Sequence, residues 1–99
     1  MVQRRSVRQQ RLLKDFGVHI KRWRKVNSMS ASDVADRASI TRETLRNIEN
    51  GTGTARMDSL MAVLAVMGIA DTVVDAANPY NSEVARVRID EILKTGDTL

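Results

Sequence analysis

The sequence predicts a small all-α domain. The chain has 99 residues, of which 42% are hydrophobic and only three are aromatic, so the expected core is built from aliphatic side chains. Apolar residues recur at spacings of three and four, which is the period of an amphipathic helix. Hydroxyl residues precede several of these segments and glycines follow them, as is typical of helix starts and ends.

The net charge of +4 is unevenly distributed along the chain. Residues 1–14 carry five basic and no acidic residues, whereas residues 71–99 carry three basic and six acidic residues. We expect a polyanionic partner to bind the basic N-terminal part of the chain. The absence of cysteine excludes a disulfide framework and cysteine-ligated zinc, and it fits a reducing cytoplasm. No apolar run approaches transmembrane length, so no membrane partner is expected.

Residues 1–12 are expected to form a basic N-terminal arm, because residues 1–10 are polar and lack an apolar stripe. Basic arms commonly contact phosphates or the minor groove of DNA, and a solubilising tail is the alternative interpretation.

The first core helix is expected over about residues 15–27. Its predicted inward stripe consists of Phe16, Ile20 and Trp23, which are spaced by four and three residues. His19 lies beside this stripe without a cysteine or a carboxylate cluster, so a metal-binding or catalytic role is not expected.

Two short helical patterns lie between Ser30 and Gly51, with room for only a tight turn between them. The first begins at Ser30, and Asp33 three residues later gives a near match to a capping box. The second begins at Thr41 and ends at Asn50-Gly51, where glycine tolerates the left-handed cap.

The second of these helices has two chemically different faces. Leu45, Ile48 and Glu49 point one way. The outward face carries polar and charged side chains, namely Thr41, Arg42, Glu43, Arg46 and Asn47. Arginine can bond guanine, asparagine can bond adenine, and a carboxylate can accept from cytosine, so this face suits base reading. A solvated surface helix is the alternative.

Glu49 is expected to form an ion pair with Arg24. A carboxylate beside Leu45 would be costly to bury without a partner, and Arg24 borders the inward face of the first helix. The alternative is a solvated Glu49 at a frayed helix end.

A polar loop follows Gly51, and an apolar helix is then expected over residues 57–67 as the central packing helix. Its methionines are expected to fill the core rather than to bind metal. A short fifth helix over residues 71–77 completes the predicted domain, residues 13–77.

Asn78-Pro79-Tyr80-Asn81 is the clearest break in the chain, and residues 78–99 are expected to form a C-terminal extension. Residues 82–93 fit a helix capped by Ser82, which is the favoured interpretation. The same residues also alternate between apolar and charged, so a strand is the alternative interpretation. Either element would carry apolar residues outside the domain, so dimerisation or partner binding is the expected role.

Residues 16–69 resemble the helix-turn-helix domains of phage repressors, Cro proteins and bacterial xenobiotic-response-type regulators. The segments that carry the resemblance are Phe16-Gly17, Trp23-Arg24, Ser30 to Ala35, Thr41 to Gly51 and Leu60 to Ile69. The resemblance implies a five-helix repressor-like fold with a C-terminal extension. It also implies a transcriptional repressor that binds a pseudo-palindromic operator in double-stranded DNA as a homodimer, through the major groove.

The resemblance further implies roles for individual residues. The implied base-reading residues are Thr41, Arg42, Glu43, Arg46 and Asn47. The implied backbone-contacting residues are Ser30, Ala31, Ser32, Thr44, Asn50 and Thr52. Many family members have glutamine at the position of Ala31, where it contacts a phosphate. Here that contact is lost or passes to Ser30, Ser32 or a main-chain amide.

The C-terminal extension looks like that of family members that act as antitoxins. The alternative function is therefore an antitoxin that inhibits a toxin enzyme and represses its own operon. No enzymatic activity, cofactor or metal is expected, because the chain has one histidine, no glycine-rich phosphate loop and no paired carboxylates in a pocket-like context. The expected localisation is cytoplasmic, at the nucleoid.

Overall fold

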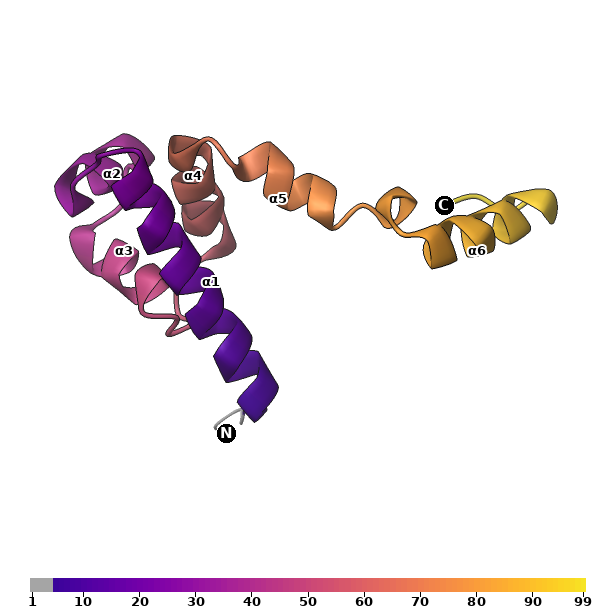
Figure 1. The fold of residues 1–99 in the computed structure, drawn as a ribbon, viewed down its shortest axis with the longest axis horizontal. Helices are drawn as coiled ribbons and strands as arrows, with labels where there is room; N and C mark the ends of the chain where they lie inside the picture. Colours follow the sequence, from indigo (N-terminus) through magenta and orange to yellow (C-terminus); the bar gives the residue numbers. More distant parts are fainter. Residues whose placement is uncertain (1–4) are drawn as a thin grey trace.

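A computed structural model describes residues 5–99, which form six α-helices and one short 3-10 helix (Figure 1). The elements are α1 (Val7–Val26), α2 (Ala31–Ala38), α3 (Arg42–Glu49), α4 (Met57–Met67), α5 (Ala70–Ala76), η1 (Pro79–Asn81) and α6 (Glu83–Lys94). No strand occurs within residues 5–99, so the all-α prediction is confirmed. The extension adopts the favoured helix.

Helices α1 to α4 surround one aliphatic core (Figure 1). In this core α1 packs on α3 and α2 packs on α4. The largest completely buried side chains come from all four helices: Ile20, Val34, Leu45, Val63 and Leu64. Burying each of these aliphatic side chains contributes about 1.5–3 kcal/mol.

Helix α1 begins at Val7, well before the expected start near residue 15. Ser6 and Gln9 form a capping box, in which the Ser6 hydroxyl accepts from the Gln9 amide and the Gln9 side chain accepts from the Ser6 amide, both at 3.1 Å. Residues 7–12 of the predicted N-terminal arm therefore belong to α1, and the expectation that residues 7–10 lack helical structure is wrong. Residues 1–4 of the predicted arm lie outside the described residues.

The inward stripe of α1 is also rotated from its predicted position. Ile20 is buried, but Phe16 and Trp23 are 37% and 41% exposed. The core-facing side instead includes Gly17, where an added Cβ would lie 2.6 Å from the Ile48 carbonyl oxygen. Because glycine has no side chain, the backbone of α1 approaches the end of α3 closely, and the flanking aromatic rings face outward.

Helix α5 leads away from the core, and α6 projects from the rest of the molecule beyond η1 (Figure 1). The main contacts of α6 are with η1. Ile89 is buried there, whereas Val84, Val87 and Leu93 are 68%, 59% and 49% exposed. The extension therefore leaves apolar side chains outside the core.

Among the described helices, none is long and apolar enough by itself to cross a membrane. Helices α4 and α5 reach that length and composition only as a pair, across a bend of 119°.

Candidate nucleic-acid interface

A three-residue connection, Ser39 to Thr41, sets the angle between α2 and α3. Ser39 has a left-handed backbone with φ of +56°. The Ser39 amide donates to the Asp36 carbonyl at 3.2 Å, and the Ile40 amide donates to the Ala35 carbonyl at 3.0 Å. These bonds close the end of α2 and let α3 begin immediately afterwards.

Helix α3 is anchored by one face and presents the other to solvent. Leu45 and Ile48 are buried in the core. The Thr41 hydroxyl caps the helix by accepting from the Thr44 amide at 3.1 Å. On the outward side, Thr41, Arg42, Glu43 and Arg46 are exposed and Asn47 is half-buried. The structure therefore gathers all five residues predicted to read bases at one end and one side of a single helix.

Arg24 and Glu49 lie in direct contact between α1 and the end of α3. The Arg24 Nε donates to Glu49 Oε2 at 2.8 Å, and Arg24 Nη2 donates to Glu49 Oε1 at 3.0 Å. Their side chains are only 13% and 9% exposed. The hydrogen bonds with the Glu49 carboxylate raise the pKa of Arg24 above its ordinary value, against the effect of burial.

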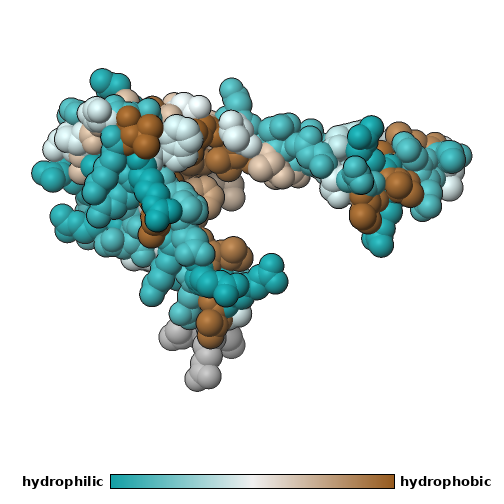
Figure 2. Space-filling model, viewed as in Figure 1, coloured by the Kyte–Doolittle hydropathy of each residue, from teal (hydrophilic) through white to brown (hydrophobic). Residues whose placement is uncertain are grey.

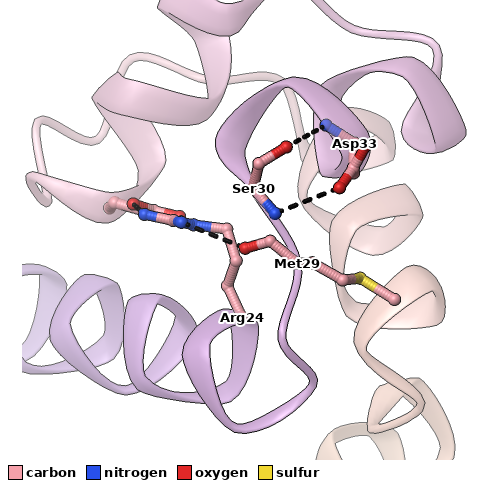
Figure 3. Close-up of polar contacts among 5 residues, drawn as sticks. Arg24, Met29, Ser30 and Asp33 are labelled. Atoms are coloured by element: carbon pink, nitrogen blue, oxygen red, sulfur yellow. Dashed lines mark hydrogen bonds and ion pairs between the residues drawn. The ribbon is translucent and has the colours of Figure 1, made fainter.

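The same arginine also fixes the loop that leads into α2. Its Nη1 donates to the Met29 carbonyl at 3.3 Å (Figure 3). Arg24 thus joins α1, the end of α3 and the residue that precedes the N-cap of α2. One side chain therefore helps to set the relative positions of both helices of the turn motif.

The start of α2 is a complete capping box. The Ser30 hydroxyl accepts from the Asp33 amide at 3.1 Å, and the Asp33 carboxylate accepts from the Ser30 amide at 3.2 Å (Figure 3). Hydrogen bonding with Ser30 lowers the pKa of Asp33. The Ser30 amide has the larger effect and the Ser30 hydroxyl the smaller one. At this predicted phosphate-contacting point, Ala31 is half-buried and Ser32 is exposed.

The loop after α3 carries the remaining predicted backbone contacts, Asn50 and Thr52. The Thr52 amide and hydroxyl both donate to the Asn47 carbonyl, at 3.1 and 3.2 Å. Arg5 donates from Nη1 to the Thr52 carbonyl at 2.6 Å. Sequence reasoning missed this contact of Arg5, because its residues lie 47 positions apart and nothing in their local pattern links them.

Between residues 5 and 99, no three histidine, cysteine, aspartate or glutamate side chains are grouped to hold an ion. The His19 Nδ1 instead lies 3.3 Å from Arg22 Nη1.

A family model described as helix-turn-helix matches residues 20–73, which is more than half of the chain. This is the family of phage repressor, Cro and xenobiotic-response-type helix-turn-helix proteins. The match extends from the middle of α1 through α5 and includes α2 and α3 in full. No curated protein and no solved structure showed significant similarity to the chain.

Proposed function

Because the chain belongs to the phage repressor, Cro and xenobiotic-response-type helix-turn-helix family, a family of DNA-binding transcription regulators, we propose that it is a repressor of transcription. In this proposal two copies bind a pseudo-palindromic operator in double-stranded DNA. Each copy places its α3 in the major groove, and the two copies occupy successive turns of that groove about 34 Å apart.

The observation that carries the proposal is the fixed orientation of α3. Leu45 and Ile48 anchor one face in the core, and the Arg24–Glu49 ion pair holds the helix end. The side chains on the outward face have the donors and acceptors that distinguish bases in the major groove. We assign base reading to Thr41, Arg42, Glu43, Arg46 and Asn47.

Phosphate contacts are assigned to the two ends of the turn motif. Such contacts set the position on the duplex without reading sequence. The assigned residues are Ser30, Ala31, Ser32, Thr44, Asn50 and Thr52. Ala31 has no polar side chain, and the amide and hydroxyl of Ser30 are already bonded to Asp33, so a phosphate there is expected to be held by the hydroxyl of Ser32 or a main-chain amide.

Selection of bound sequences from a random DNA pool tests the proposal. The full chain is expected to select a two-fold symmetric site. Arg42→Ala is expected to lose discrimination at one position of each half-site, at a cost of about 1–3 kcal/mol. Arg86→Ala is the matched control, because it removes the same charge from an exposed position on α6 that does not share a face with Val84 and Val87. Unchanged discrimination by the Arg42→Ala protein would refute the reading-face assignment.

The exposed apolar residues of α6 support a second candidate function, an antitoxin that binds and inhibits a toxin enzyme. Residues 13–77 would then bind DNA while residues 78–99 bind the partner. Co-expression with the product of the neighbouring reading frame tests this function. A stoichiometric complex that is lost on truncation after Asn78 would support it. Operator binding by a chain without a neighbouring toxin gene would count against it.

A further inference from the structure

An exposed apolar stripe runs along α1 on the side that does not face the core. Its members, which we call the α1 seam, follow one another at spacings of four, three, four and three residues: Leu12, Phe16, His19, Trp23 and Val26. This heptad-like spacing is the one that lets a helix pack along a second helix. Sequence periodicity predicted that Phe16 and Trp23 point inward together with Ile20, but only Ile20 is buried and these two rings belong to the exposed seam.

Exposure and surface shape both indicate a docking surface. The apolar seam residues Leu12, Phe16, Trp23 and Val26 are 54%, 37%, 41% and 71% exposed. A shallow cavity of about 270 Å³ lies along the seam at His19, Arg22, Trp23 and Val26. A second, of about 200 Å³, lies beside Phe16 and is lined by apolar residues of α1, α3 and α4. Apolar side chains of a partner helix on the seam could fill the first cavity, whereas the second lies toward Gly17, Ile20 and Ile48.

Helix α6 carries a surface with the complementary character. Val84 and Val87 are exposed on it, and Glu83, Asp90 and Glu91 lie four before, three after and four after Val87. Residues at these spacings share a helix face, so three carboxylates border the valines, and the basic residues Arg88 and Lys94 lie on the same face. Figure 2 shows hydrophobic patches both over α6 and over the N-terminal half of α1.

Two surfaces of a second copy could dock on the α1 seam: its own α1 seam or its α6. Charge favours α6. Arg8 lies four residues before Leu12, and Arg22 lies three residues after His19, so basic side chains flank the seam. Asp15 is the only acidic residue in α1. Two seams packed together would bring their arginines together, whereas the apolar face of α6, where carboxylates outnumber basic side chains by three to two, would place carboxylates beside them.

Length and connectivity also agree with this occupant. The seam extends for about 21 Å and α6 for about 18 Å at 1.5 Å per residue. In its own chain α6 projects away from α1 and packs mainly on η1 (Figure 1).

We propose that α6 of one copy docks on the α1 seam of a second copy. The proposal rests on the homodimer proposed above and specifies the surfaces that join its two chains. It leaves the outward face of α3 free for DNA.

Trp23 is the only tryptophan and lies in the seam, so its fluorescence reports on docking directly. The full chain is expected to have the mass of a dimer by light scattering. On dilution it should dissociate, and the Trp23 emission should shift to longer wavelength in parallel. A monomer at every concentration, or a dimer whose Trp23 emission does not change when it dissociates, would overturn the proposal.

Matched variants then test the two surfaces. Val84→Asp/Val87→Asp is expected to raise the dissociation constant at least tenfold without unfolding the chain, because both valines are exposed. Val18→Asp is the control, since Val18 is 43% exposed on α1 but lies outside the seam. A dimer that survives the α6 substitutions unchanged, or one disrupted equally by the control, contradicts the assigned surfaces.

Charge reversal tests the pairing of these surfaces. Arg8→Glu/Arg22→Glu gives a chain with two acidic surfaces, and Asp90→Lys/Glu91→Lys gives one with two basic surfaces. Each variant alone is expected to dimerise at least tenfold more weakly, and an equimolar mixture is expected to form heterodimers. Failure of the mixture to associate would exclude the pairing. Because all these measurements are made without DNA, they are independent of the selection assay that tests the proposed function.

Discussion

The Arg24–Glu49 ion pair is the polar contact that joins α1 to the end of α3. Glu49→Ala leaves a largely buried guanidinium that keeps its charge, because arginine cannot be deprotonated in proteins. We expect the free energy of unfolding to fall by about 2–4 kcal/mol, slightly less than the usual cost of removing one partner of a fully buried pair, because both side chains keep some exposure. Urea denaturation at pH 7 measures the change.

A double variant, Arg24→Met/Glu49→Met, is the control for this interpretation. It removes both charges and keeps apolar volume, so it is expected to lose less stability than Glu49→Ala. If the single variant unfolds at the same urea concentration as the unmodified chain, the pair does not contribute to stability.

Asp33 makes the start of α2 sensitive to acid. Its pKa in the folded chain is below the ordinary value of 3.8, because the Ser30 amide and then the Ser30 hydroxyl stabilise its charged form. The carboxylate therefore contributes stability that is present above about pH 3.8 and is lost as the pH falls through the lower folded value.

Asp33→Asn removes this charge and keeps the side-chain shape. The variant is expected to be less stable than the unmodified chain at pH 7, and the difference should shrink as the pH falls below 3.8. Thermal unfolding at several pH values between 7 and 2 measures this. A difference that stays constant across this range would mean that the Asp33 charge contributes nothing.

At the scale of residues, sequence reasoning identified partners only where a physical cost required one. Glu49 shares a face with Leu45. Because burying its charge without a partner would be costly, the sequence predicted an ion pair with Arg24 on another helix. The contact of Arg5 with Thr52 could not be predicted, because both groups could equally be solvated. Its existence depends on the path of the extended α1 beside the loop.

Gly17 controls how closely α1 packs on α3. In Gly17→Ala the new Cβ would overlap the carbonyl oxygens of Ile48 and Glu49, which are backbone atoms and cannot rotate away. Alanine would favour the isolated helix by about 1 kcal/mol, but the overlap costs about 1–3 kcal/mol or more. We therefore expect a net loss of stability in urea denaturation.

An exposed site on the same helix supplies the comparison for Gly17. Val18→Ala also introduces alanine into α1, at a position 43% exposed. Surface substitutions of this kind usually change stability by less than about 0.5 kcal/mol. A Gly17→Ala chain as stable as the Val18→Ala chain would show that α1 can move away from α3 without cost.

At the scale of elements, capping residues predicted where helices begin more accurately than apolar periodicity predicted which side of a helix faces the core. Ser30, Thr41 and Ser82 each cap a helix at the predicted place. The start of α1 was missed because the capping box of Ser6 and Gln9 precedes a segment without an apolar stripe. Periodicity also could not show that Gly17 would face the core in place of the aromatic rings.

Residues 5–99 form a core of α1 to α4, with Ala70 and Val73 of α5 packed against it, and a projecting extension that contains α6. The sequence left helix and strand open for residues 82–93, because the apolar residues satisfy both periods. The helix forms with its own internal hydrogen bonds, whereas a strand needs a partner, and no strand occurs in residues 5–99.

Truncation after Asn78 tests this division at the scale of the molecule. All buried residues except Ile89 precede the cut, and α6 packs mainly on η1, which the cut also removes. The shortened chain is therefore expected to keep its helical core and an unfolding free energy within about 0.5 kcal/mol of the full chain's monomeric value. Circular dichroism in urea, at concentrations where the full chain is monomeric, measures this.

The same truncation should affect DNA binding selectively. Affinity for a single half-site is expected to change little, because α3 and its supports remain. Affinity for two half-sites should fall, because the two copies no longer bind as a linked pair. Titrations at one fixed salt concentration compare the two probes, since phosphate contacts make the affinity strongly salt-dependent. An equal loss on both probes would instead place residues 79–99 in direct contact with each half-site.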